Sequence, residues 1–257
     1  MISERVASFL SYAPHVRKSG VDTSSMLEQP LTAERSTFEE TPMLVRLPGV
    51  YPPQEDTRLL AGALARENLG PHSHVLDICT GTGALSLCAA AAGAGHVTAV
   101  DVSRRALATT WINARLRHRS VRVMRGNLTE PVRGQLFDVI VSNPPYVPTL
   151  DDVLPTRGVE RAWDAGVDGR MLLDRICVQA PAMLAQSGVL LIAQSALSGV
   201  EKTQTMLEEQ GLSIEIADRV EIPFGRVLSS RAALFESRGL IDTGQRTEEI
   251  VVIRAVR

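Results

Sequence analysis

The sequence has few cysteines and no surplus of charge. Its 257 residues contain three cysteines, widely spaced and without a Cys-x-x-Cys pair, which argues against a disulfide framework and a structural zinc site. The five histidines show no ligand spacing, so we expect no bound metal. Such cysteine usage fits a reducing, cytoplasmic compartment. The formal net charge of −2 does not indicate a general nucleic-acid binder.

Long apolar runs are also missing. No stretch approaches the ~20 apolar residues that a membrane-spanning helix needs, and residues 1–17 lack the apolar core of a signal peptide. We therefore expect no association with a membrane. Hydrophobic residues nevertheless make up 44% of the chain, which is enough to build a sizeable core in one large domain.

The first 45 residues differ from the rest of the chain. They are polar, with scattered apolar residues and many serines, threonines and glutamates. Two interpretations stay open: a partly ordered extension, or a small helical cap that meets the substrate. From residue 46 to residue 257 the sequence becomes regular, and we assign this part to one folded domain.

Strand-like and helix-like stretches alternate through this domain. Such alternation implies a mostly parallel sheet with helices on both faces. The last two expected strands have no full crossover helix between them, which predicts an antiparallel tail. The expected strands are 74–78, 96–100, 121–124, 138–142, 189–195, 213–220 and 250–255, and the expected helices are 55–67, 84–92, 104–116, 171–185 and 200–210.

The first expected strand ends in a glycine-rich turn. Residues 77–83 read Asp-Ile-Cys-Thr-Gly-Thr-Gly, and glycines between a strand and a helix let a ligand approach the backbone closely. A plain tight turn would have the same pattern. Two acids favour a ligand: Asp77 precedes the glycines, and Asp101 ends the next strand, where it can accept hydrogen bonds from a ribose diol.

The same turn favours S-adenosylmethionine over a dinucleotide. The third glycine of a Gly-x-Gly-x-x-Gly motif is Ser86 here, and a pyrophosphate gains nothing from the nearby Asp77 carboxylate. S-adenosylmethionine has an ammonium group for that carboxylate, a ribose and an adenine, and it has no phosphate. Asn127, at the end of the third expected strand, could meet the adenine amino group; a turn residue without a ligand is the other interpretation.

The tetrapeptide Asn143-Pro144-Pro145-Tyr146 follows the fourth expected strand and suits a planar NH2 group. An amide nitrogen is a poor nucleophile because its lone pair is delocalised into the carbonyl. The Asn143 side-chain oxygen and the Pro144 carbonyl can each accept an N–H, which orients the nitrogen and favours the positive charge that develops on it. Pro145 stiffens the loop, and the Tyr146 ring can stack on the target. A Pro-Pro that merely ends a strand is the alternative.

With these motifs the chain resembles the HemK-type protein glutamine methyltransferases over roughly residues 47–195. These enzymes use S-adenosylmethionine to methylate the glutamine of the Gly-Gly-Gln loop in class I peptide-chain release factors. The match is closest to the short archaeal and eukaryotic branch of the family. The resemblance is carried by residues 50–57, 77–83, 143–146, 158–163 and 166–170.

The resemblance implies a class I methyltransferase fold, which is a Rossmann-like α/β fold. Its sheet is twisted, mostly parallel and seven-stranded, with an antiparallel C-terminal strand and helices on both faces. Residues 46–257 would form this domain, which binds S-adenosylmethionine and releases S-adenosylhomocysteine. The implied catalytic residues are Asn143, Pro144 and Tyr146, and Pro145 joins them in holding the target amide. The implied cofactor-binding residues are Thr57, Asp77, Cys79, Gly81, Gly83, Asp101, Asn127, Leu128 and Asn143.

The resemblance also implies partners. A class I release factor would be the protein substrate, and in the short branch a small activating subunit pairs with the edge of the third strand. Arg122 on that strand weighs against the same pairing here. Basic residues crowd residues 115–125. A solvated helix end beside a charged edge strand explains them, and contact with RNA or an acidic protein is the other interpretation.

Some residues depart from the family pattern. Cys79 stands where the loop usually has its first glycine, and Asn127 replaces a frequent aspartate. Bacterial members carry a helical N-terminal domain that recognises the release factor, whereas only the polar residues 1–45 precede the core here. Residues 222–248 exceed the pattern of the short branch. The acceptor therefore stays open, and a small molecule or a nucleic-acid base is the alternative to a protein glutamine. A non-catalytic binding protein with the same fold is the remote alternative.

Overall fold

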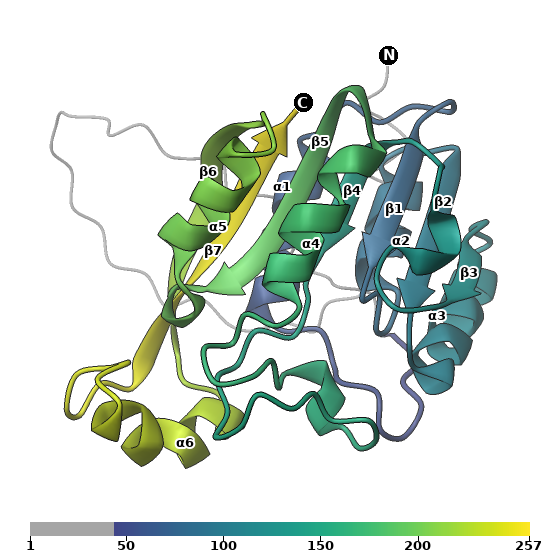
Figure 1. Ribbon diagram of the computed structural model, residues 1–257. Coiled ribbons are helices and arrows are strands. Elements are labelled where there is room, and N and C mark those ends of the chain that lie inside the picture. Colours follow the sequence, from purple (N-terminus) through teal and green to yellow (C-terminus); the bar gives the residue numbers. More distant parts are fainter. Residues whose placement is uncertain (1–43) are drawn as a thin grey trace, which may run out of the picture. The chain divides into compact units, whose positions relative to one another are not determined.

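The chain folds around one seven-stranded sheet. The computed structural model describes residues 44–257, so the predicted extension of residues 1–45 lies outside the described residues except for its last two positions. The strands are hydrogen-bonded in the order β3-β2-β1-β4-β5-β7-β6 (Figure 1). Their bounds are β1 His74–Ile78, β2 His96–Asp101, β3 Arg122–Arg125, β4 Phe137–Ser142, β5 Leu184–Ser195, β6 Ser213–Pro223 and β7 Thr247–Val256.

The pairing of the strands places a topological switch point next to β1. Strand β1 is parallel to β2 on one side and to β4 on the other, while the chain runs first to β2 and β3 and only then to β4. Strand β5 continues the parallel part beside β4, and β7 is antiparallel to both β5 and β6. In open α/β sheets, ligands bind outside the carboxyl ends of the strands at such a switch point.

Helices cover both faces of the sheet. On one face, α4 and α5 contribute Leu173, Ile176 and Leu207 to a core with the strands, and on the other, α1 and α2 contribute side chains such as Leu60 and Leu85. Figure 1 shows α4 and α5 in front of the sheet. The helices are α1 Glu55–Ala65, α2 Ala84–Ala91, α3 Arg104–Leu116, α4 Leu173–Gln179, α5 Val200–Glu208 and α6 Arg226–Ser237, with short 3-10 turns at Glu130–Val132, Glu160–Ala162, Pro181–Met183 and Ala196–Ser198.

Helix α6 lies in the connection between β6 and β7 and packs on a loop instead of the sheet. Its residues Leu228, Ala232 and Phe235 form a third apolar cluster with Val147, which belongs to the loop after β4. This loop, residues 144–168, and α6 lie together along the lower edge of the molecule in Figure 1. The cluster therefore ties the β6–β7 connection to the segment that begins with the predicted reactive tetrapeptide.

The predicted fold class is confirmed, including the antiparallel last strand, and three local expectations differ. The helix expected at 171–185 ends at Gln179 because Pro181 cannot donate a backbone hydrogen bond, and a 3-10 turn leads directly into β5. The last two strands are longer than expected. Helix α6, which the sequence did not indicate, joins them without crossing the sheet. Within residues 44–257, no helix is long and apolar enough to cross a membrane.

Candidate active site

A cavity of about 890 Å³ lies where the carboxyl ends of the parallel strands meet. Its wall includes Cys79 after β1, Asp101 at the end of β2, Asn127 after β3 and Asn143 after β4. Because parallel strands end at one edge of a sheet, these four segments converge although they are far apart in the sequence. The entry segment before α1, the loop of residues 144–168 and the β6–β7 connection close the remaining sides.

The glycine-rich turn after β1 holds its backbone in the left-handed region. Cys79, Gly81 and Gly83 have φ angles of 62°, 56° and 81°. A non-glycine residue in this region is strained by about 1–3 kcal/mol, which explains why a glycine would be the ordinary choice at position 79. The Gly81 N–H donates to Asp101 Oδ2 over 3.1 Å, so the turn is locked to the end of β2.

Gly83 is needed for packing and does not line the cavity. A Cβ atom at this position would lie 2.7 Å from Cγ2 of Thr110 on α3. Its φ of 81° also disfavours any side chain. The absence of a Cβ therefore lets the start of α2 rest against α3.

Asp77 is also absent from the cavity wall. It is fully buried, and its Oδ2 accepts hydrogen bonds from Thr80 Oγ1 at 2.6 Å, Ser86 Oγ at 2.6 Å and Ser86 N at 3.0 Å. Burial raises the pKa of Asp77 to about 6. Its Oδ1 has no hydrogen-bond partner among the described residues. The carboxylate thus stabilises the turn through Thr80 and Ser86, while its second oxygen stays without a partner among the described residues.

Asp101 does line the cavity. Beyond Gly81, it accepts a hydrogen bond from Ser103 N through Oδ1 at 2.8 Å. Burial raises the pKa of Asp101, and the nearby Arg161 guanidinium opposes this rise. Next to it, Asn127 and Leu128 form the wall after β3, and Leu128 has a φ of 54°. This half of the cavity has the acceptor and the apolar surface that a ribose and an adenine need.

The tetrapeptide is fixed by residues of α1. The Asn143 Nδ2 group donates to Thr57 Oγ1 over 3.0 Å, which turns the Oδ1 atom of the same amide away from Thr57. The Tyr146 hydroxyl donates to Asp56 Oδ2 over 2.8 Å, and burial holds the Tyr146 pKa well above its ordinary value. Asn143, Pro144, Pro145 and Tyr146 all line the cavity. The side chains of Asn143 and Tyr146 are therefore held in place by hydrogen bonds to α1.

The loop that follows the tetrapeptide is anchored to α6 by two arginines. The Arg231 Nη1 atom lies 2.7 Å from Asp164 Oδ1 and donates to the Pro148 carbonyl over 3.1 Å. Arg238 donates to the carbonyls of residues 149 and 150, at 2.6 and 3.3 Å. Capping these loop carbonyls with cationic donors keeps the loop ordered beside the cavity.

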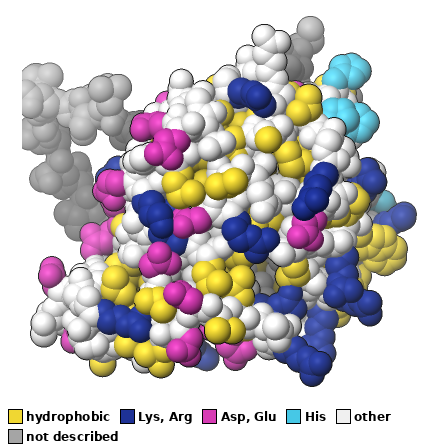
Figure 2. All heavy atoms as spheres, viewed as in Figure 1, with side chains coloured by type: hydrophobic (Ala, Val, Ile, Leu, Met, Phe, Trp, Pro, Cys, Tyr) yellow, Lys and Arg dark blue, Asp and Glu magenta, His cyan; other side chains and the backbone are white. Residues whose placement is uncertain are grey.

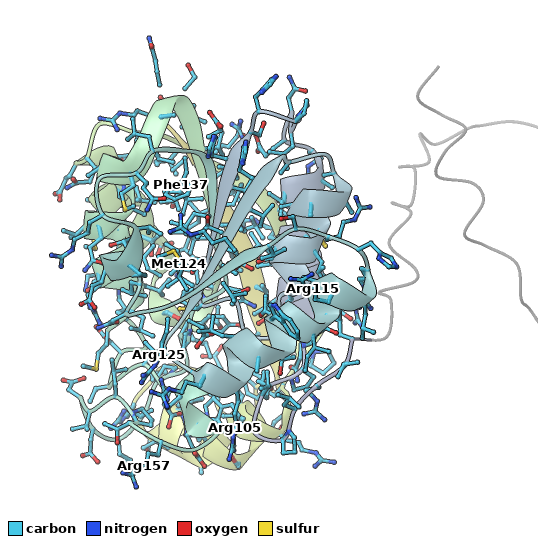
Figure 3. The ribbon with its side chains drawn as sticks, turned by 90° about the vertical axis from the view of Figure 1, so that its right-hand side faces the viewer. Arg105, Arg115, Met124, Arg125, Phe137 and Arg157 are labelled. Carbon is cyan, nitrogen blue, oxygen red and sulfur yellow. The ribbon has the colours of Figure 1, made fainter. Side chains whose placement is uncertain are left out.

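Arginines dominate the face formed by α3 and β3. Dark blue side chains gather at the lower right of the molecule in Figure 2, on the side where Figure 1 places α3. Figure 3 looks onto this side and labels Arg105 and Arg115 on α3, Arg125 on β3 and Arg157 in the loop below. All four are exposed. The crowding predicted from the sequence is therefore a surface feature, and its ligand stays a hypothesis.

Several wall residues were not singled out from the sequence. Asp56, Tyr51 and Trp163 lie in segments that carry the family resemblance, and the Tyr51 and Trp163 rings meet edge to face with centroids 5.2 Å apart. Because these three residues lie in segments that carry the resemblance, the sequence could have indicated them as cavity residues. Arg161 lies there too, whereas Glu248 at the start of β7 has no sequence signal, because only the sheet brings β7 to the cavity.

Comparisons with known proteins agree with this geometry. A family model described as "Methyltransferase small domain" matches residues 43–157. A protein of Methanocaldococcus jannaschii, provisionally named a protein N5-glutamine methyltransferase, is 36% identical over 181 residues, covering 70% of this chain and 90% of the relative. The release factor glutamine methyltransferase of Bacillus anthracis is 29% identical over 198 residues, covering 73% of this chain and 68% of the relative.

A solved structure has the same fold. It is the E. cuniculi Mtq2–Trm112 complex, which is responsible for methylation of the eRF1 translation termination factor. The likeness covers 81% of this chain and 99% of the solved one, with 25% identity and a TM-score of 0.56. Because this chain spans 90% of the archaeal relative at 36% identity, it belongs to the HemK-type family of S-adenosylmethionine-dependent protein glutamine methyltransferases.

Proposed function

We propose that the protein methylates the side-chain amide nitrogen of a glutamine in the Gly-Gly-Gln loop of a peptide-chain release factor. The observation that carries this proposal is the fixed orientation of Asn143. Its Nδ2 is engaged by Thr57 at 3.0 Å, so its Oδ1 is available as an acceptor at the wall of the same cavity that Asp101 lines. An amide acceptor and a ribose acceptor in one cavity suit a reaction between an NH2 group and a nucleoside-bearing methyl donor.

We assign the half of the cavity beside β2 and β3 to S-adenosylmethionine. In this assignment Asp101 accepts from the ribose hydroxyls, Asn127 meets the adenine amino group, and Leu128 packs on the adenine. Cys79, Gly81 and Thr57 line the path of the methionine portion. The buried, unpartnered Oδ1 of Asp77 supports a nearby ammonium group, whereas Gly83 contributes through packing alone.

The bound donor supplies an electrophilic methyl group and leaves as S-adenosylhomocysteine. The residues of the tetrapeptide supply orientation. In the proposed complex, Asn143 Oδ1 and the Pro144 carbonyl each accept one N–H of the target amide, which points its nitrogen at the methyl carbon. The same two oxygens stabilise the positive charge that grows on that nitrogen. The Tyr146 ring stacks on the amide plane, and Pro145 keeps the Pro144 carbonyl directed into the cavity.

The choice of a release factor rests on the relatives. The Bacillus anthracis protein is named for that substrate, and the solved E. cuniculi complex methylates eRF1. The same complex contains Trm112, and as part of the proposal we keep a small activating subunit at the free edge of β3 as a partner to be tested. Exposed Arg122 and Arg125 on that strand make such a pairing less favourable, because their charges would have to be desolvated or matched.

The decisive experiment uses labelled S-adenosylmethionine with a release factor, with its loop Gln→Ala variant, and with a cell extract. We expect label on the wild-type factor and none on the variant. Label that appears only on a small molecule or on nucleic acid would refute the proposed acceptor. Repeating the first reaction with and without a candidate activating subunit tests the partner separately.

A further inference from the structure

Glu248 is a buried carboxyl group that the proposed reaction does not use. It is the second residue of β7, opposite Ile222 of β6, and both residues line the cavity. Glu248 is only 6% exposed. Its neighbour Glu249 points the other way and lies 3.4 Å from Arg219. The two adjacent glutamates therefore differ in one respect that matters: one faces the cavity and the other faces solvent.

No cation compensates Glu248 within the part of the chain that the structure describes. The nearby Ser195 side chain partly opposes the rise in the Glu248 pKa that burial causes, and the Oε2 atom has no partner among the described residues. A buried acceptor without a partner costs about 1–3 kcal/mol. Natural structures keep few such groups, and they often mark a place where a ligand completes the hydrogen bonding.

The surroundings of Glu248 belong to the acceptor half of the cavity. Burial raises the pKa of Glu248, and the nearby Asp56 carboxyl group adds to that rise. Burial also raises the pKa of Tyr51 and Tyr146, and Glu248 adds to both rises. Asp56 is the residue that accepts from the Tyr146 hydroxyl. The carboxyl groups of Asp56 and Glu248 thus lie near the Tyr146 ring. The proposed donor half of the cavity contains Asp101 and arginines instead. A neutral group that brings N–H donors fits such a place, and a third carboxyl group, carried by the ligand, does not.

We propose that Glu248 makes the acceptor pocket selective for a neutral amide with N–H groups over an anionic side chain of the same shape. In this role Glu248 accepts a hydrogen bond from an N–H of the substrate beside the target amide. Its negative charge repels a substrate that has a glutamate where the target glutamine should be. The inference rests on the proposed function, since it concerns the acceptor of that reaction. It adds a specificity-determining residue, contributed by the last strand of the sheet, to the tetrapeptide.

The test compares two peptides that differ by one group. A Gly-Gly-Gln loop peptide and its Gly-Gly-Glu counterpart are titrated into protein saturated with S-adenosylhomocysteine at pH 8, with fluorescence anisotropy as the readout. We expect the wild type to prefer the amide by about tenfold or more, as one like charge at short range predicts. In Glu248→Gln this preference falls at least about threefold below its wild-type value, since only the Asn143 and Pro144 oxygens still disfavour a carboxylate, and in the matched control Glu249→Gln it is unchanged.

Two further readouts separate selectivity from folding. Affinity for S-adenosylhomocysteine is expected to be the same in all three proteins, because Glu248 lies in the acceptor half. In the wild type the preference shrinks between pH 8 and pH 6, since Glu248 has a pKa of about 7 and becomes neutral. The groups that face it are Asp56 from α1, Tyr51 from the entry segment, Tyr146 from the loop after β4 and Ser195 from β5.

Each outcome decides the inference. A preference as large in Glu248→Gln as in the wild type, or a wild type that binds both peptides equally, overturns the role of Glu248 and leaves the proposed function intact. A wild type that binds neither peptide and does not methylate a release factor overturns both.

Discussion

Replacing Thr57 by valine tests whether one hydrogen bond orients the catalytic amide. Valine keeps the shape of threonine and removes the Oγ1 atom that accepts from Asn143 Nδ2 at 3.0 Å. A neutral hydrogen bond of this kind contributes about 1 kcal/mol net. Without it, the Asn143 amide can rotate and present its NH2 group where its oxygen should be. We expect kcat to fall roughly five- to tenfold, which corresponds to about 1–1.4 kcal/mol.

The assay is the initial rate of methyl transfer at saturating donor, together with calorimetry of donor binding. The control is Thr57→Ser, which keeps the hydroxyl group and should retain most of the rate. If Thr57→Ser loses as much rate as Thr57→Val, the hydrogen bond is not the cause. If donor affinity falls as far as kcat, Thr57 acts on the cofactor and the positioning argument is refuted.

Three other changes have expected outcomes. Asn143→Ala should remove most of the turnover while donor affinity stays within about tenfold, roughly 1.4 kcal/mol; equal loss of both would mean that its role is misassigned. Gly83→Ala should lower the free energy of unfolding by about 1–3 kcal/mol, because the new Cβ meets Thr110 at 2.7 Å and φ is positive; denaturant unfolding measures this, and an unchanged midpoint would contradict the packing argument. Glu248 has a pKa raised from 4.5 to about 7, so the folded state binds its proton more tightly than the unfolded state. Stability should therefore fall as pH rises from about 4.5 to 7, by up to about 3 kcal/mol relative to Glu248→Gln; parallel pH profiles of the two proteins would rule this out.

From the sequence, the residues after β2, β3 and β4 were easier to place at the cavity than the rest of its wall. Asp101 ends β2, and Asn127 and Asn143 follow the ends of β3 and β4. Parallel strands bring such residues to one edge of the sheet whatever the details of packing. The family and the enzyme class predicted from these motifs are confirmed by the relatives. The same argument predicts Asp77 at the cavity; in the structure it is buried beside the wall, where Thr80 and Ser86 donate to its Oδ2 atom, and its role toward a cofactor stays a prediction.

The acceptor half depends on contacts between distant parts of the chain. Helix α6 has an apolar side that packs on Val147 of a loop and not on the sheet, so the pattern of the strands around it does not indicate this helix. Glu248 lies 105 positions after Asn143 in the sequence and reaches the cavity only because β7 inserts between β5 and β6. Such positions carry no local signal, since an isolated glutamate before an apolar run reads as an ordinary exposed residue.

The β6–β7 connection, which contains α6, also has an evolutionary consequence. Its length can change without altering strand order, because both strands pair along their whole lengths before α6 begins and after it ends. Most residues that we propose for the methyl donor lie between residues 74 and 143, whereas the β6–β7 connection contributes to another part of the cavity wall. Insertions and exchanges here could therefore redirect the enzyme to new acceptors while the methyl-donor machinery is inherited intact, and chimaeras between relatives are best joined at Pro223 and Thr247.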